Sequence, residues 1–110
     1  MPWLFSEGFF ADADKVQFAL NKMLNSPRPQ SAAGYAGQLA ALLRYDTRPI
    51  LKDIKCPTTV IAGGDDRLTP SWLSMDIANG IESAEYIEFD NMGHMVPIER
   101  PLELVDIIRG

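Results

Sequence analysis

The stretch CPTTVIAGGDDRLTP, residues 56–70, contains the pattern that decides the fold. Its residues TTVIA, at positions 58–62, are β-prone and uncharged, and two glycines follow them. A short run of this kind is typical of a buried strand in a parallel sheet. Thr69 and Pro70 then favour a helix that runs to Gly80, with Thr69 as its N-cap and Pro70 at its first position. The segment therefore predicts a strand, an acidic turn and a helix in succession.

The sequence after this segment continues the same alternation. Residues 85–89 are expected to form a second strand, and Pro101 is expected to start a last helix. The apolar face of that helix consists of Leu102, Leu104, Val105 and Ile108. The order strand, helix, strand, loop and helix is typical of an α/β protein.

The sequence before this segment predicts helices only. Apolar residues at helical spacing favour one helix over residues 13–25, preceded by Asp12, and a second helix that begins after Ser31. Residues 48–55 are expected to form a short helical turn or loop. Its inward-facing residues are expected to be Ile50, Leu51 and Ile54.

The length of 110 residues predicts one domain. We expect a helical part over residues 1–55 and a strand–helix–strand–helix part over residues 56–110. The composition, 46% hydrophobic and 23% charged, is that of an ordinary soluble globular protein.

The charge and cysteine content exclude several classes of partner and site. A net charge of −5 without any cluster of Lys and Arg disfavours nucleic acid and anionic membranes as partners. The single cysteine, Cys56, excludes an internal disulfide and a thiolate metal site. No apolar stretch approaches the ~20 residues of a membrane span, and residues 1–15 lack the features of a signal peptide. We therefore expect a soluble, cytoplasmic protein.

Polar clusters follow both expected strands, at the edge of an α/β sheet where ligands and catalytic groups gather. Asp65 and Asp66 follow the first strand, and Gly93 and His94 lie in the loop after the second. A carboxylate beside an imidazole can fix its tautomer and stabilise its protonated form, so His94 is a candidate general base. Each residue also has a purely structural interpretation: an Asp can cap a helix or form a turn, a lone His can be structural, and Gly93 can supply a positive φ.

A metal site is a weaker alternative. His94 together with Asp65, Asp66 or Asp90 offers one imidazole and unspaced carboxylates, which form no recognised ligand set.

Two blocks of the sequence resemble the α/β-hydrolase superfamily. CPTTVIAGGDDRLTP resembles its acid-bearing strand and turn, and FDNMGHMVPIERPLELVDII, residues 89–108, resembles its terminal strand, histidine loop and last helix. The resemblance implies that Asp66 is the catalytic acid and His94 the catalytic base. Asp65 is then a neighbour that shapes the turn or is solvated.

The upstream sequence resembles the lid of enol-lactonase-like members of this superfamily. The similar segments are WLFSEGFFADADK, residues 3–15, and LLRYDTRPILKDIKCP, residues 42–57. The lid implies an apolar substrate pocket lined by Trp3, Phe5, Phe9, Phe10 and Met23. Core packing explains each of these side chains at least as well.

The chain departs from the superfamily because it contains no G-x-S-x-G nucleophile elbow. Its serines lie in cap, loop or helix contexts, at positions 6, 26, 31, 71, 74 and 83. It resembles the C-terminal half of a hydrolase, a partial α/β-hydrolase fold with two parallel strands, flanking helices and a helical lid remnant. The complete enzyme would attack an ester or lactone with a serine, and no metal or organic cofactor is implied. A catalytically inert oligomerising or binding module is the alternative.

A sheet of two strands predicts self-association. Such a sheet is marginally stable, and the first strand would leave an edge free to pair with another chain. We therefore expect a homodimer or a higher assembly, formed by exchange of helices or by continuing the sheet across a two-fold axis.

Overall fold

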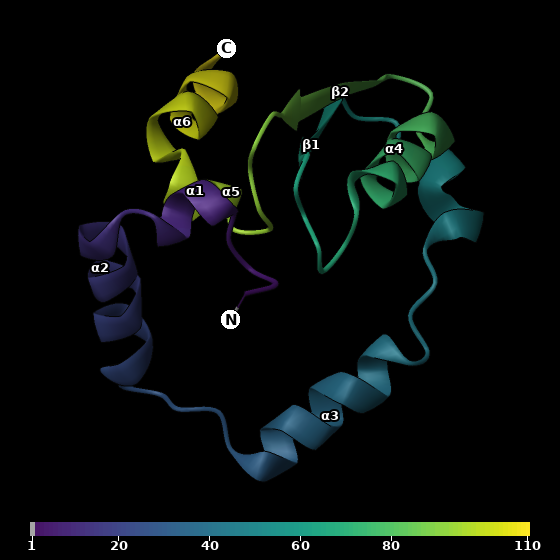
Figure 1. Cartoon of the computed structure of the whole chain (residues 1–110). Helices are drawn as coiled ribbons and strands as arrows, with labels where there is room; N and C mark the ends of the chain where they lie inside the picture. The colour runs from purple at the N-terminus through teal and green to yellow at the C-terminus, as the bar shows by residue number, and fades with distance from the viewer. Residues whose placement is uncertain (1) are drawn as a thin grey trace.

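The computed structural model describes residues 2–110, which form an α/β arrangement (Figure 1). Its elements, in chain order, are α1 (Glu7–Phe10), α2 (Ala13–Leu24), α3 (Ala32–Leu42), the 3-10 helix η1 (Arg48–Asp53), β1 (Thr58–Gly63), α4 (Ser71–Gly80), β2 (Ala84–Phe89), α5 (Val96–Glu99) and α6 (Pro101–Arg109).

The two strands pair in parallel, in a register that runs from Thr58 opposite Ala84 to Gly63 opposite Phe89. Helix α4 makes the crossover between them and packs against both strands. Figure 1 shows α4 on one side of the strands and α6 on the other. The predicted fold class, two parallel strands with flanking helices, is confirmed.

Side-chain caps fix where the N-terminal helices begin. Asp12 accepts a hydrogen bond from the backbone N–H of Lys15 at the start of α2, and Ser31 accepts one from Gly34 at the start of α3. These caps confirm the two predicted helix starts, because the Asp and Ser oxygens satisfy N–H groups that lack a partner within the helix. The four-residue helices α1 and α5 were not predicted.

The predicted N-cap of α4 was wrong. The helix begins at Ser71, and Pro70 occupies the N-cap position without a side-chain bond to the helix. The hydroxyl of Thr69 donates instead to Oδ2 of Asp66, at 2.9 Å. Thr69 lies one residue before the N-cap position, and its hydroxyl bonds to the acid turn rather than to the helix.

The prediction that Ile50 faces inward was also wrong. Leu51 is buried, whereas Ile50 is 56% exposed. In a 3-10 helix residues three apart share a face. Ile50 and Leu51 are adjacent in the helix and therefore point in different directions, and Ile54, the C-cap residue, is half-buried.

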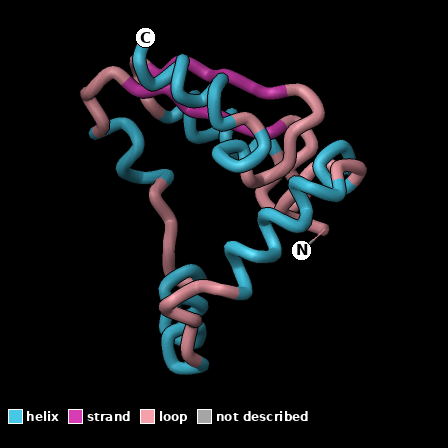
Figure 2. Tube along the Cα trace, turned by 90° about the vertical axis from the view of Figure 1, so that its left-hand side faces the viewer, coloured by secondary structure: helices cyan, strands magenta, loops and turns pink. Residues whose placement is uncertain are grey.

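The hydrophobic core of the N-terminal part centres on Phe5, Phe9 and Ala19. The rings of Phe5 and Phe9 stack with centroids 4.1 Å apart. Helix α3 has no buried residue and lies away from the sheet in both backbone views (Figures 1 and 2). The radius of gyration, 16.0 Å, accordingly exceeds the roughly 13 Å of a compact chain of this length.

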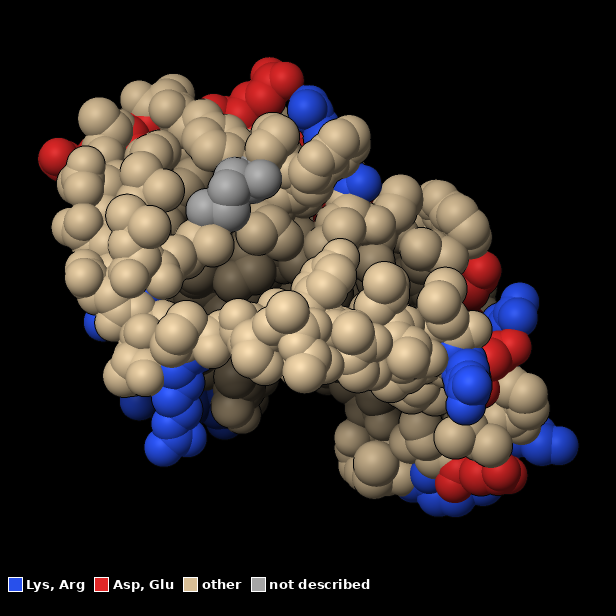
Figure 3. Space-filling view, turned by 90° about the horizontal axis from the view of Figure 1, so that it is seen from below, with Lys and Arg blue, Asp and Glu red and all other residues tan. Residues whose placement is uncertain are grey.

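Large apolar side chains are exposed along the helices of this open arrangement. Trp72 of α4 is 61% exposed, and Leu102 and Ile108 of α6 are 79% and 74% exposed. Figure 3 shows a face with a broad uncharged area and charged side chains at its margins. None of the helices found in residues 2–110 has the length and apolar character needed to cross a membrane.

Two glycines allow the backbone to pack closely where the strands end: Gly63 against the loop after β2, and Gly93 against the N-terminal segment. A Cβ at Gly63 would lie 2.2 Å from the carbonyl oxygen of Gly93, and a Cβ at Gly93 would lie 2.6 Å from the backbone of Phe5 and Ser6. Gly93 is not in the positive-φ region, which Asn91 occupies with φ 56°. The expectation that Gly93 supplies a positive φ is therefore corrected: this glycine is needed because a side chain would strike backbone.

We expect Gly93→Ala to lower the free energy of unfolding by about 1–3 kcal/mol, because overpacked sites relax at this cost. Urea unfolding followed by far-UV circular dichroism measures the change. Gly37→Ala in α3 is the matched control, because nothing lies within 4 Å of its Cβ. Alanine in that helix should instead stabilise the chain by roughly 0.5–1 kcal/mol. Equal effects of the two substitutions would contradict the close packing at Gly93.

Candidate active site

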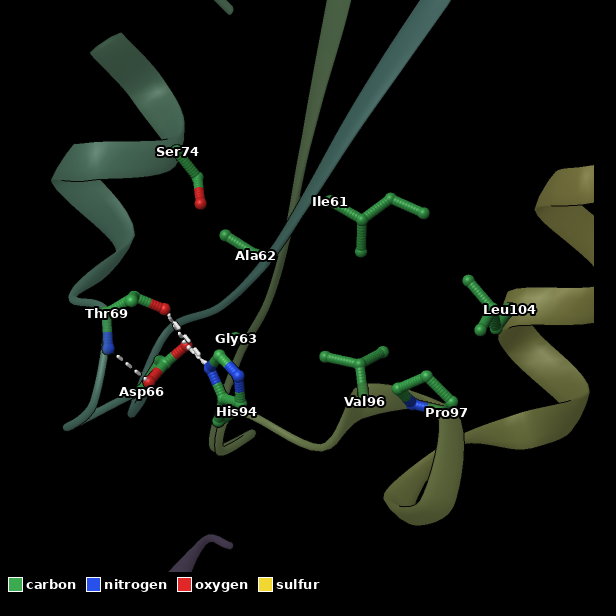
Figure 4. Close-up of a pocket in the computed structure, with 10 residues that line it drawn as sticks. All are labelled: Ile61, Ala62, Gly63, Asp66, Thr69, Ser74, His94, Val96, Pro97 and Leu104. Carbon is green, nitrogen blue, oxygen red and sulfur yellow. Dashed lines mark hydrogen bonds and ion pairs between the residues drawn. The ribbon is translucent and has the colours of Figure 1, made fainter. Parts of the chain in front are cut away.

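The candidate site lies where β1 and β2 end. Asp66 lies in the turn after β1, and His94 lies in the loop after β2. The carboxyl ends of parallel strands meet at one edge of the sheet, so the two loops lie side by side. Nδ1 of His94 is 2.8 Å from Oδ2 of Asp66, and Figure 4 shows the imidazole beside the carboxylate. The structure therefore brings together the two residues that the sequence analysis paired.

The carboxylate of Asp66 has a separate task for each oxygen. Oδ1 accepts hydrogen bonds from the backbone N–H groups of Leu68 and Thr69, both at 2.9 Å. Oδ2 faces His94 and the hydroxyl of Thr69. The turn-forming role and the partnership with histidine, which the sequence left as alternatives, are thus both present in one side chain.

The neighbouring Asp65 contributes through its backbone. Its N–H donates to the carbonyl oxygen of Met92 at 2.8 Å, which ties the acid turn to the histidine loop. Its side chain is exposed. The sequence analysis expected Asp65 either to shape the turn or to be solvated. The side-chain bonds that shape the turn come from Asp66, and the carboxylate of Asp65 is solvated.

Thr69 is a third member of the site that the sequence analysis did not identify. Its Oγ1 lies 2.9 Å from Oδ2 of Asp66 and 3.1 Å from Nδ1 of His94. Figure 4 shows the hydroxyl directed at both side chains. The spacing of three residues from Asp66 was the only signal in the sequence, and it indicated a turn or a cap equally well.

These contacts determine which nitrogen of the imidazole carries the proton. An ionised carboxylate only accepts hydrogen bonds, so Nδ1 of His94 must be protonated to face Asp66. The hydroxyl of Thr69 donates to Asp66, which leaves its oxygen free to accept from the same Nδ1–H. The lone pair of the neutral ring is therefore on Nε2, where it can accept a proton from a substrate or a nucleophile.

The pKa of Asp66 lies below the ordinary value of 3.8. Burial raises this pKa, but the hydrogen bonds donated by Thr69, His94 and Leu68 lower it by more. The side chain of Asp66 is only 8% exposed and that of His94 is 35% exposed. Asp66 is therefore ionised at neutral pH, as the proposed tautomer of His94 requires.

A cavity of about 310 Å³ opens beside the pair (Figure 4). Its polar lining is provided by Asp66, Thr69, His94 and Ser74, and its apolar lining includes Ile61, Val96 and Leu104. Within residues 2–110 the ring of His94 bonds to Asp66 and Thr69, and no bond joins it to Ser74. In the same described range, no group of three or more His, Cys, Asp and Glu side chains is placed to hold a metal ion.

The aromatic residues expected to bind substrate lie outside this cavity. Phe5 and Phe9 are buried in the N-terminal core, at 6% and 5% exposure, and Trp3 is 60% exposed. None of the three lines the cavity beside His94. Phe10 and Met23, the other residues expected there, are exposed on α1 and α2.

Comparison with known proteins gives one consistent family. Residues 1–107 match the alpha/beta hydrolase family. The chain is 35% identical over 78 residues to AB hydrolase superfamily protein YisY of Bacillus subtilis, a match that covers 71% of this chain and 28% of that protein. It is 30% identical over 102 residues to 3-oxoadipate enol-lactonase 2 of Acinetobacter baylyi, covering 88% of this chain and 35% of the enol-lactonase. The chain therefore spans roughly a third of the length of these relatives.

Solved structures show the same partial correspondence. A thermophilic esterase from Thermogutta terrifontis superposes with a TM-score of 0.80 at 28% identity, over 98% of this chain and 39% of the esterase. Est816, described as an N-acyl homoserine lactone degrading enzyme, superposes with a TM-score of 0.82 at 22% identity, over 96% of this chain and 42% of Est816. The second likeness concerns the fold alone.

The hydrogen bonds to Asp66 predict that stability depends on pH. In the unfolded chain this carboxyl titrates near pH 3.9, and in the folded chain its pKa is lower. The folded state therefore binds fewer protons, so the contribution of Asp66 is fully present above about pH 4 and is lost as the pH falls through the folded pKa. At neutral pH we expect the free energy of unfolding of wild type to exceed that of Asp66→Asn by about 1.5–3 kcal/mol, the contribution of a hydrogen bond to a charged group.

Urea unfolding of both proteins between about pH 3 and about pH 7 measures this difference, which should shrink toward the acid end. Asp65→Asn is the matched control, because the side chain of Asp65 is exposed and its replacement should change the free energy of unfolding by no more than about 0.5 kcal/mol. A difference between wild type and Asp66→Asn that stays constant over the range would contradict the lowered pKa.

Proposed function

Because the chain belongs to the alpha/beta hydrolase family, we propose that it carries the acid and the base of a hydrolase that acts on small-molecule esters or lactones. The observation that carries this proposal is the 2.8 Å contact between His94 Nδ1 and Asp66 Oδ2, beside a cavity at the carboxyl ends of two parallel strands. The esterase and enol-lactonase among the similar proteins support the choice of substrate class.

In this mechanism His94 acts through Nε2. It removes the proton of a serine hydroxyl as that oxygen attacks the substrate carbonyl, and it then returns the proton to the leaving group. Asp66 accepts the Nδ1–H bond throughout and stabilises the positive ring, because its charge is close and partly shielded from water. The hydroxyl of Thr69 helps to hold Oδ2 of Asp66 toward the ring.

The nucleophile must come from polypeptide outside these 110 residues, since the sequence contains no G-x-S-x-G elbow. The oxyanion donors, which that elbow partly supplies, must come from the same source. The share of the esterase that this chain covers, 39%, is consistent with that division.

We assign the substrate side of the site to the helical part, residues 1–55, acting as a lid within a single domain. Of the aromatic residues predicted to bind substrate, Trp3 is exposed, whereas Phe5 and Phe9 are buried. The stacked, buried rings of Phe5 and Phe9 support the segment that carries Trp3.

An inert oligomerising or binding module is the second candidate function. Two observations favour it for the chain as it stands: the nucleophile elbow is missing, and large apolar side chains such as Trp72 and Leu102 are exposed. Exposed apolar surface of this kind marks interaction sites.

A chimera tests the catalytic proposal directly. In it, this chain replaces the matching segment of 3-oxoadipate enol-lactonase 2, which provides the remainder of the fold. We expect the chimera to hydrolyse a short-chain p-nitrophenyl ester. Asp66→Asn should lower its kcat by about 10³–10⁴-fold, because the imidazole then adopts the wrong tautomer, and His94→Ala should have an effect of similar size.

The isolated chain is the control for this experiment, and its ester turnover should equal that of its own His94→Ala variant. Asp65→Asn in the chimera should leave kcat within about threefold of the parent, because that side chain faces solvent. A folded, active chimera whose turnover is indifferent to His94→Ala would exclude the proposed role of the pair.

We also propose that the isolated chain forms homodimers, because a two-stranded sheet leaves both outer edges open. Multi-angle light scattering at micromolar concentration should give twice the mass of 12.2 kDa. Dilution should then shift the population toward the monomer. A monomer at every concentration would rule out self-association.

A further inference from the structure

A second carboxylate near the histidine loop, that of Glu99, accepts three hydrogen bonds. Oε1 accepts from the backbone N–H of Ser6 at 2.9 Å and from that of Gly93 at 3.2 Å. Oε2 accepts from the hydroxyl of Ser6. Ser6 is 5% exposed, and its Oγ also accepts the N–H of Phe9 at the start of α1. Glu99 thus joins the N-terminal segment, the histidine loop and α5.

These bonds hold the chain immediately before His94, and another bond holds the chain immediately after it. The N–H of Gly93 is bound by Glu99, and the N–H of Met95 donates to the carbonyl oxygen of Leu4 at 2.9 Å. Both neighbours of His94 are therefore attached to the same N-terminal segment. The absence of a side chain at Gly93 permits this, because a Cβ there would strike the backbone of Phe5 and Ser6.

This attachment adds to the bond between the N–H of Asp65 and the carbonyl oxygen of Met92, which ties the same loop to the acid turn. The side chain of His94 is 35% exposed, so surrounding atoms do not enclose it fully. Its ring meets Asp66 only while the backbone of residues 93–95 stays in place. Loops without such bonds move readily and populate several conformations.

We propose that Glu99 is a positioning residue for His94: by binding Ser6 and Gly93 it fixes the histidine loop so that Nδ1–H faces Asp66. Ser6 assists by presenting both a backbone N–H and a hydroxyl to the same carboxylate. The inference rests on the proposed function only in naming His94 as the base. The placement of the ring can be tested without any catalysis.

The single histidine of the chain makes the test specific. Long-range ¹H–¹⁵N spectra of the neutral imidazole report which nitrogen carries the proton, without ambiguity of assignment. We expect Nδ1–H in wild type. In Glu99→Ala the loop loses its bond at Gly93, and the two bonds that join Glu99 to Ser6 are lost with it. The ring should then turn to water, and the Nε2–H form, which a free histidine prefers, should become the major one.

Conservative and matched variants separate positioning from a general loss of structure. Glu99→Gln keeps an oxygen that can accept from the N–H groups of Ser6 and Gly93, so it should retain Nδ1–H as the major form. Glu103→Ala removes an exposed glutamate that pairs with Arg100 at 2.7 Å, and should leave the tautomer unchanged. A folded Glu99→Ala protein with the wild-type tautomer would overturn the proposal.

Two further measurements keep the test decisive. If Glu99→Ala does not fold, amide hydrogen exchange in wild type replaces it: the N–H groups of Gly93 and Met95 should be protected as well as those of the β1–β2 ladder. Exchange as fast as in exposed loops would overturn the positioning role. Asp66→Asn shows which part of the account fails. If Asp66→Asn shifts the tautomer and Glu99→Ala does not, only the role of Glu99 is wrong. If neither variant shifts the tautomer, the interaction between Asp66 and His94 is itself wrong.

Discussion

The site depends on the contact between two loops at the carboxyl ends of β1 and β2. The N–H of Gly64 bonds the carbonyl oxygen of Phe89 at 2.9 Å, and the N–H of Asp65 bonds that of Met92 at 2.8 Å. These bonds extend the strand pairing past the end of the sheet. They are possible because Gly63 has no side chain to keep the loops apart. The same contact sets the distance between the acid on one loop and the imidazole on the other.

Each loop is then stabilised by one carboxylate that accepts several hydrogen bonds. Asp66 holds its own turn through Oδ1 and meets His94 through Oδ2, so the groups that keep it ionised also fix its orientation. Glu99 has the corresponding place beside the histidine loop, where it binds the N-terminal segment. An imidazole that is already oriented needs little rearrangement when positive charge develops on it. A preorganised site favours proton transfer for this reason.

The sequence predicted those parts of the fold that repeat a local pattern. The uncharged run before two glycines gave β1, and Asp12 and Ser31 marked the starts of α2 and α3. Helices α1 and α5 are too short for periodicity to reveal them. The bond between Ser6 and Glu99 joins residues 93 positions apart, which no local pattern reports. The aromatic character of Phe5 and Phe9 is likewise compatible with both a pocket and a core, and their place in the buried N-terminal cluster depends on contacts that the sequence does not report.

The central claim, that Asp66 and His94 interact at the end of a parallel sheet in a member of the alpha/beta hydrolase family, is tested most directly by a double-mutant cycle. The free energies of unfolding of wild type, Asp66→Asn, His94→Gln and the double variant are measured in urea at neutral pH. Side chains in contact should give a coupling energy of about 0.5–3 kcal/mol. Effects that add to within roughly 0.3 kcal/mol, as at distant sites, would contradict the claim.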